Sequence, residues 1–231
     1  MIYITGDTHN TLDLNKVLWK DYKEDDYLII CGDVCVPKFG MIQPCNLEED
    51  KAFRRLNKLK CKVLFTDGNH ENFAYLNNLP VEEWNGGKVH KISDNIIHLM
   101  RGQVFNIDRY KIFTFGGATS LDKHVRVEGY TWFREEDCSF ADTEEALKNL
   151  AKHNNKVDFI ITHTIGKEFI YRHMYNTVKA REDYMGAINN FLDYIDDIVE
   201  YKQWYFGHFH FDIEYLDCKK TLLYNLVKTI E

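Results

Sequence analysis

The chain lacks the features of membrane-spanning and disulfide-stabilised proteins. Its apolar runs are far shorter than the about 20 residues that a membrane-spanning helix needs. Its six cysteines show no C-x-x-C pair and no zinc-ribbon spacing, which favours reduced thiols. Only three prolines occur, and no Pro/Gly-rich linker, low-complexity tract or internal repeat divides the 231 residues. We therefore expect one domain over residues 1–231, without a signal peptide, in the cytoplasm.

An excess of basic charge is also absent. The 29 Lys and Arg residues are outnumbered by 36 Asp and Glu residues, and the formal net charge is -7. This charge disfavours nucleic-acid binding through a broad basic face, because that mode depends on neutralising phosphates. A nucleotide or a short nucleic acid remains possible as a substrate, since the local charge at one site can differ from the net charge of the chain.

Five short apolar runs each lead into residues of types that bind metals. The runs are rich in Ile, Val, Phe and Tyr, as buried strands are. They are IYIT before Gly6-Asp7-Thr8-His9, YLIIC before Gly32-Asp33, KVLFT shortly before Gly68-Asn69-His70-Glu71, FIIT before His163, and WYF before Gly207-His208-Phe209-His210. In helix-covered sheets, ligands bind outside the carboxyl ends of the strands. The sequence therefore predicts a metal centre formed by Asp7, His9, Asp33, Asn69, His163, His208 and His210.

This ligand set predicts the kind and number of ions. Carboxylate oxygens, neutral imidazoles and one amide oxygen suit Mn, Fe, Zn or Ni better than Ca. Seven ligands exceed what one such ion takes, whereas two ions about 3.5–4 Å apart, sharing a carboxylate, would use them all. Such a pair makes a nucleophile of bound water and neutralises phosphoryl oxygens in an in-line displacement at phosphorus. We expect two divalent ions, with Mn favoured.

Taken in order, the five blocks resemble the calcineurin-like metallophosphoesterase superfamily over residues 6–210. The resemblance implies one ion held by Asp7, His9 and His210, a second held by Asn69, His163 and His208, and a bridge at Asp33. It implies that His70 is an outer-sphere residue that donates a proton to the leaving oxygen or steadies the transition state. It also implies two packed mixed β-sheets flanked by helices, the four-layer αββα sandwich of that superfamily. The expected activity is hydrolysis of a phosphoric ester by metal-activated hydroxide.

The second block departs from the Ser/Thr protein phosphatase branch of that superfamily. There the block reads Gly-Asp-x-Val-Asp-Arg-Gly, whereas here Val36 and Pro37 replace the carboxylate and the phosphate-binding Arg. The difference favours phosphodiester or nucleotide-type substrates, because monoester dianions gain more from additional Arg contacts. A phosphomonoesterase or protein phosphatase remains an alternative, as does a non-catalytic metal-binding scaffold of the same fold.

A sixth apolar run, residues 111–115, ends in Gly116-Gly117-Ala118 without a ligand. We interpret the next stretch, residues 119–136, as a substrate loop because it is dense in basic and aromatic residues. The side chains expected to meet phosphate are those of Lys123, His124, Arg126 and Arg134. Its aromatic residues are interpreted as a local packing cluster, with base stacking as the second interpretation. His90 and His98 have no motif around them, and we interpret them as surface or structural residues.

Apolar periodicities predict helices that cover the sheets. One helix is expected to open at a capping box of Asp142 and Glu145, and two others to span residues 47–59 and 188–199. Alternation from Ile213 to Leu226 predicts a terminal hairpin. Strands that alternate with helices and are followed by antiparallel strands predict an α/β class with a mixed sheet.

Overall fold

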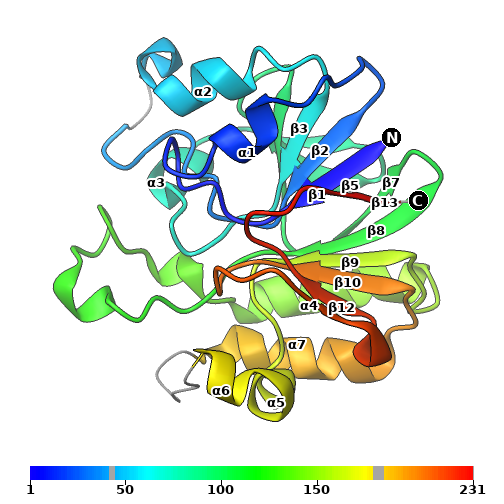
Figure 1. The fold of residues 1–231 in the computed structure, drawn as a ribbon. Coiled ribbons are helices and arrows are strands. Elements are labelled where there is room, and N and C mark those ends of the chain that lie inside the picture. Colours follow the sequence, from blue (N-terminus) through cyan, green and yellow to red (C-terminus); the bar gives the residue numbers. More distant parts are fainter. Residues whose placement is uncertain (42–44, 179–184, 231) are drawn as a thin grey trace.

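The polypeptide forms two mixed β-sheets with helices on their outer faces, as seen in a computed structural model (Figure 1). The structure describes residues 1–41, 45–178 and 185–230. The mixed α/β class and the pair of helix-flanked sheets predicted from the sequence are confirmed. No helix in these described ranges is long and apolar enough to cross a membrane.

The larger sheet has seven strands within the described residues and a parallel centre. Its strands are β1 (Ile2–Thr5), β2 (Tyr27–Ile30), β3 (Lys62–Phe65), β4 (Val81–Trp84), β5 (Gly87–Lys91), β6 (Ile96–Leu99) and β13 (Lys228–Ile230). They lie in the order β13-β1-β2-β3-β6-β5-β4. Strands β1, β2, β3 and β6 are parallel, whereas β13, β5 and β4 pair antiparallel to their neighbours.

The second sheet has six strands within the same ranges. They are β7 (Gln103–Ile107), β8 (Tyr110–Phe115), β9 (Phe159–Thr162), β10 (Gln203–Phe206), β11 (Ile213–Tyr215) and β12 (Lys220–Leu222). They lie in the order β11-β12-β10-β9-β8-β7. Strands β8, β9, β10 and β12 are parallel, and the edge strands β7 and β11 are antiparallel to their neighbours.

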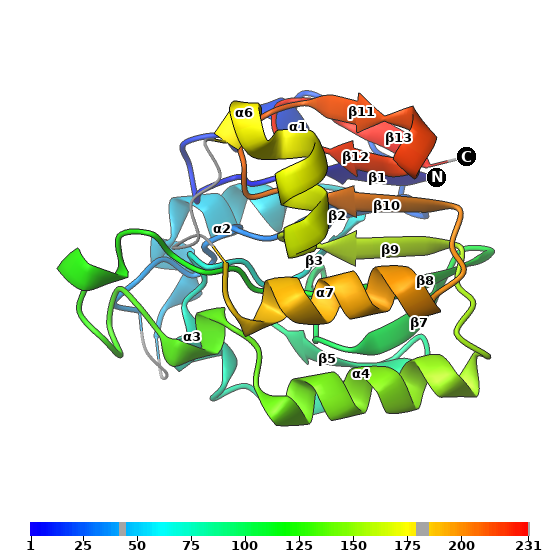
Figure 2. The same cartoon turned by 90° about the horizontal axis from the view of Figure 1, so that it is seen from below.

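The five runs that precede the candidate metal ligands are all strands, and those within each sheet end level with one another. In the larger sheet, Thr5 pairs with Ile30, and Ile30 pairs with Phe65. In the smaller sheet, Tyr205 pairs with Ile161. Figure 2 shows the segment between β8 and the following helix reaching out beyond this end of the sheets. The topology therefore directs the residues that follow these strands towards one region.

Helices cover both outer faces. They are α1 (Asn15–Leu18), α2 (Lys51–Leu56), α3 (Phe73–Leu76), α4 (Phe140–Lys152), α5 (Lys167–Phe169), the π-helix η4 (Ile170–Met174), α6 (Tyr175–Val178) and α7 (Ala187–Ile198). Short 3-10 helices occur at η1 (Leu47–Glu49), η2 (Lys123–Val125), η3 (Arg134–Glu136) and η6 (Leu216–Cys218). In Figure 1, α1 to α3 lie outside the seven-stranded sheet, and α4 to α7 lie outside the six-stranded sheet.

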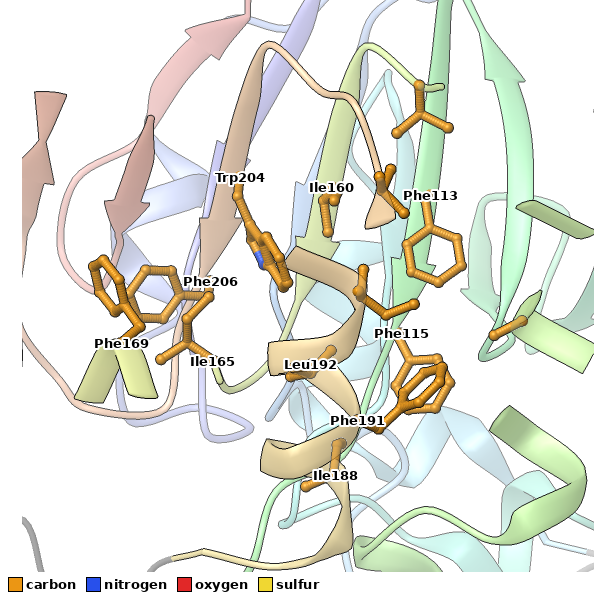
Figure 3. Packing of buried hydrophobic residues seen from close by; sticks show 14 of the residues in the cluster. Phe113, Phe115, Ile160, Ile165, Phe169, Ile188, Phe191, Leu192, Trp204 and Phe206 are labelled. Atoms are coloured by element: carbon orange, nitrogen blue, oxygen red, sulfur yellow. The ribbon is translucent and has the colours of Figure 1, made fainter. Parts of the chain in front are cut away.

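Three clusters of buried apolar side chains hold these elements together. One lies between the sheets and joins Ile4 and Leu64 of the larger sheet to Ile161 of the smaller one. A second packs the outer face of the larger sheet against α1 and α2. A third packs the outer face of the smaller sheet against α4, α5 and α7, with Trp204 and Leu192 at its centre (Figure 3).

Two helix starts differ from the sequence prediction. The expected helix over residues 47–59 is interrupted at Asp50, because its carboxylate accepts hydrogen bonds from Ala52 N at 2.8 Å and Phe53 N at 3.0 Å and caps the shorter α2. Helix α4 begins earlier than predicted. Its capping box pairs Ser139 with Asp142, rather than Asp142 with Glu145.

The predicted terminal hairpin is confirmed as far as Leu222, where β11 and β12 pair. Beyond that residue the prediction is wrong, because Tyr224 and Leu226 do not continue the strand. The Asp212 carboxylate instead accepts their backbone N–H groups, at 2.7 and 3.0 Å. The chain then enters the other sheet, where β13 pairs with β1.

Candidate metal centre

The ends of β1, β2, β3, β9 and β10 bring together carboxylates and imidazoles that sequence analysis selected. Among the described residues, three groups have one candidate ligand atom per residue, all within 4.8 Å of one another. They are Asp7 with His9 and His210, Asp7 with Asp33 and His163, and His9 with Asp33 and His70. Because the groups share members, they form one continuous cluster.

Asp7 lies at the centre of the first group and is fully buried. Nε2 of His210 is 3.2 Å from Oδ2 of Asp7, and Nε2 of His9 is 3.9 Å from the same oxygen. The ring of His210 stacks on Tyr224, with the centroids 4.7 Å apart. The C-terminal segment, which crosses from β12 to β13, thus supports His210 through Tyr224.

Asp33 lies between the two sets of candidate ligands. Its Oδ2 is 3.4 Å from Nε2 of His9, and its Oδ1 is 3.4 Å from Nε2 of His163. Nε2 of His163 is also 3.1 Å from Oδ1 of Asn69, and the His208 ring packs on His163 with centroids 5.1 Å apart. The two oxygens of one carboxylate therefore face different histidines, as a bridging ligand requires.

Neighbouring groups orient the candidate ligands. Nδ1 of His9 lies 2.8 Å from Oδ2 of Asp13, and Nδ1 of His163 lies 2.6 Å from the carbonyl oxygen of Cys31. Both partners only accept hydrogen bonds, so each Nδ1 donates and each Nε2 is left to face the cluster. Such hydrogen bonds fix the orientation of metal-binding histidines in proteins.

One oxygen of Asp7 lacks a hydrogen bond although it is buried. Oδ1 of Asp7 accepts the backbone N–H of His208 at 2.9 Å, whereas Oδ2 makes no hydrogen bond among the described residues and has the ring nitrogens of His210 and His9 near it, at 3.2 and 3.9 Å. A buried carboxylate oxygen without a partner costs free energy unless a cation satisfies it. The donor set and this oxygen together fit a metal ion.

The backbone at the strand ends adopts conformations that few residues tolerate. His9, Asp33, His208 and His210 have φ values of 43°, 53°, 71° and 56°, in the left-handed region. Gly32 has φ of 84°, and a Cβ atom there would lie 2.3 Å from Nδ1 of His163. Strained conformations of this kind concentrate at functional sites, where the surrounding structure holds them in place.

Charges within the cluster act strongly on one another. Burial lowers the pKa of His163, but the Asp33 carboxylate outweighs burial and raises it to about 10. Burial lowers the pKa of His208, and the neighbouring His163 adds to this effect, so that it falls to about 3. Burial raises the pKa of Asp33, but His163 and His70 outweigh it and hold this pKa well below its usual value. The carboxylates thus favour positive charge at their centre, from protons or from metal ions.

His70 lies at the edge of the cluster. Its backbone N–H donates to Oδ1 of Asp33 at 2.7 Å, and its Nε2 is 4.0 Å from Oδ2 of the same residue. It belongs to one of the three groups that could hold a metal ion, whereas the resemblance implies an outer-sphere role. Nη2 of Arg126 lies 3.3 Å from Nε2 of His70.

Of the four candidate substrate residues, Arg126 is the one seen in contact with a predicted site residue. Its side chain is 13% exposed and also pairs with Asp122 at 2.8 Å. Arg134 is 80% exposed and forms an ion pair with Glu128 instead. Lys123 and His124 lie exposed on η2.

The aromatic residues of the same segment divide between packing and exposure. Phe133 packs against Phe39 and Phe73, with ring centroids 6.3 and 5.8 Å away. Tyr130 is exposed. Local packing, the first of the two interpretations, therefore describes Phe133.

Sequence analysis missed two side chains that support the site. The buried Glu71 carboxylate accepts the backbone N–H groups of Val34 at 2.8 Å and Cys35 at 2.9 Å, so it joins the turn after β2 to the turn after β3. The Ser120 hydroxyl accepts Nδ2–H of Asn69 at 2.9 Å, which directs Oδ1 of Asn69 towards His163. Glu71 stood within a recognised block, but no local pattern marked Ser120.

Comparison with known proteins does not test these assignments, which rest on the geometry and chemistry of the site. No family model matches the chain, and a search of the curated proteins finds no match.

Proposed function

We propose that this protein is a phosphoric-ester hydrolase of the calcineurin-like metallophosphoesterase type, with two divalent metal ions. The observation that carries the proposal is the position of Asp33, whose two carboxylate oxygens face His9 on one side and His163 on the other. Asp7 and His210 complete the first side. Asn69 and His208 complete the second.

The donor set supports Mn²⁺ as the favoured ion, with Fe, Zn or Ni as alternatives. When bound, the two ions would activate a water and neutralise charge on the phosphoryl oxygens. His9 and His163 are oriented for this purpose, because each donates through Nδ1 to a fixed acceptor and presents Nε2.

His70 and Arg126 are the groups proposed to act on the substrate. His70 is placed beside Asp33 and would donate a proton to the leaving oxygen once Arg126, whose N–H its Nε2 accepts in this structure, binds the substrate instead. The guanidinium of Arg126 lies next to it and would bind a phosphoryl oxygen. One Arg beside His70 supports a diester or nucleotide-type substrate, because a monoester dianion gains more from several cations.

The fold and the cysteines supply further support. An apolar cluster between the sheets and one beneath each set of helices agree with the four-layer αββα sandwich of this superfamily. The six cysteines are unpaired, which supports a reducing compartment such as the cytoplasm.

The proposal is tested by hydrolysis of matched aryl phosphate monoesters and diesters. Protein stripped of metal and reloaded with Mn²⁺ is expected to cleave the diester faster than the monoester. His70→Ala is expected to lower kcat by about 10²–10⁴-fold, the usual contribution of a general acid. His153→Ala, at the end of α4, is the matched control. No turnover of either ester by protein with two bound ions would overturn the hydrolase and favour a metal-binding scaffold.

A further inference from the structure

A cavity of about 430 Å³ lies beside the end of β3, and none of the seven candidate metal ligands lines it. Its wall includes apolar side chains from α3 and from the residue after β6, namely Phe73, Leu76 and Met100. Buried polar groups from β5 and β6 complete it. A cavity of this size that combines apolar side chains with buried polar groups is typical of small-molecule sites.

A chain of hydrogen-bonded side chains runs along the cavity wall. Nε of Arg101 donates to Oδ2 of Asp67 at 2.8 Å, and Oδ1 of Asp67 lies 3.1 Å from Nε2 of His98. Nδ1 of His98 then lies 3.2 Å from Nδ1 of His90. Both histidines are only 5% exposed, and His90 is the last member of this hydrogen-bonded series.

The order of donors along this chain leaves one acceptor free. Arg101 keeps Asp67 ionised, and a carboxylate only accepts, so Nε2 of His98 bears the proton. This series has one direction when His98 is neutral: its Nδ1 then accepts Nδ1–H of His90, and Nε2 of His90 has only a lone pair. Burial and the nearby His98 lower the pKa of His90 to about 4, which keeps its ring neutral near pH 7.

His90 lines the cavity, and because its Nδ1 already contacts His98, its Nε2 is the ring nitrogen left for a ligand. Among the described residues it has no hydrogen-bond partner, yet it is not one of the buried unsatisfied atoms, so it is accessible from outside the protein. His90 lines the cavity and is otherwise covered. A buried acceptor that opens into such a cavity favours a ligand that carries a hydrogen-bond donor.

The charges around the cavity narrow the class of ligand further. Acidic residues outnumber basic ones in the lining, with five, Asp67, Glu135, Asp137, Asp142 and Glu145, against three, Lys88, Arg101 and Arg134. The Arg101 and Lys88 cations are already paired, with Asp67 and Glu145. An anionic ligand is therefore disfavoured.

We propose that this cavity binds a small neutral heteroaromatic molecule of one or two fused rings, which donates an N–H to Nε2 of His90. This site is separate from the proposed metal centre and does not depend on the proposed hydrolysis. The cavity adjoins the metal centre through Asp67, which lines the cavity and leads directly into the turn of Asn69. The backbone carbonyl of Asp67 also accepts Gly117 N–H at 2.8 Å.

The test uses two probes of nearly equal shape and the full-length protein. Indole has a ring N–H, and 1-methylindole carries a methyl group in its place. Binding is followed by long-range proton–nitrogen NMR spectra of the histidine rings. Indole is expected to shift the Nε2 resonance of His90 in a saturable way and to bind at least about fivefold more tightly than 1-methylindole, as one hydrogen bond allows.

Two variants assign the effect to His90. His90→Phe is expected to remove the preference for indole, and His153→Phe, outside the cavity, is expected to keep it. Equal affinity of the wild-type protein for both probes would overturn the proposal, as would an unshifted His90 Nε2 or the absence of saturable binding. The comparison of the two probes on the wild-type protein holds even if His90→Phe does not fold.

Discussion

Nη2 of Arg126 lies 3.3 Å from Nε2 of His70, and this contact joins the segment between β8 and α4 to the end of β3. Arg126 Nε is held by Asp122 at 2.8 Å, and its Nη1 donates to the carbonyl of Thr131 at 3.2 Å. The guanidinium is thus fixed by its own segment while it faces the proposed proton donor. A substrate oxygen entering between Arg126 and His70 would meet a cation that is already in position.

Replacing Arg126 tests this placement. Arg126→Met is expected to lower kcat/KM for an aryl phosphate diester by about 10- to 100-fold, because one preorganised charge to phosphate is lost. Arg109→Met, exposed in the turn between β7 and β8, is the control and should leave kcat/KM unchanged. Arg134→Met should have a much smaller effect, since Arg134 is exposed and paired with Glu128. Equal losses for Arg126→Met and Arg134→Met would contradict the assigned position of Arg126.

Ser120 is predicted to act through Asn69. Ser120→Ala removes the acceptor for Nδ2–H of Asn69, so that the amide is oriented by the contact of Oδ1 with His163 alone. Loss of such an orienting hydrogen bond typically weakens metal affinity by about 10- to 100-fold. The measurement is the Kd for Mn²⁺ by titration calorimetry, with Ser93→Ala, whose hydroxyl bonds to Asn57, as control. An unchanged Kd in Ser120→Ala would show that Asn69 needs no such support.

The strands and the gathering of the candidate ligands could be predicted because they depend on local patterns. A buried strand is a short apolar run, and IYIT, KVLF and FIIT all appear as such runs in β1, β3 and β9. Parallel strands that end level then place the residues that follow them in one region, without knowledge of the sheet order.

The remaining features depend on contacts between distant parts of the chain. The choice of Arg126 among four basic residues follows from the path of its segment over His70, which no spacing encodes. Ser120 reaches Asn69 across 51 positions, and Glu71 reaches Val34 across 37. The break at Asp50 is local, because its carboxylate bonds to backbone N–H groups and so competes with continuation of the helix. A pattern of apolar residues carries no information about that competition.

Helix α7 is predicted to depend on Leu192 for its attachment. Leu192 is fully buried between α7 and the six-stranded sheet (Figure 3). Leu192→Ala should lower the free energy of unfolding by about 2–5 kcal/mol, because it removes buried methyl groups and leaves a cavity. Tyr194→Ala, exposed on the same helix, is the control and should change it by less than about 1 kcal/mol. Urea unfolding measures both, and similar losses would contradict the packing of α7.

His90 is predicted to make stability fall in mild acid. Its pKa is lowered from 6.5 to about 4 in the folded protein by burial and by His98, so the unfolded chain binds the proton first. The contribution of neutral His90 to the free energy of unfolding is present above pH 6.5 and is lost as the pH falls towards about 4. We expect the free energy of unfolding to fall by about 1–2 kcal/mol over this range. Urea unfolding across this window should show a shallower decline for His90→Gln than for the wild type. Parallel curves would contradict the lowered pKa.

The bridging position of Asp33 is tested most directly by counting Mn²⁺ ions and measuring the magnetic coupling between them. Titration of metal-free protein followed by electron paramagnetic resonance should give two Mn²⁺ per chain. Their spectrum should show exchange coupling, as expected for ions about 3.5–4 Å apart that share a carboxylate. In Asp33→Ala this coupling should disappear. A single bound ion, or two ions without coupling in the wild-type protein, would contradict the dinuclear centre.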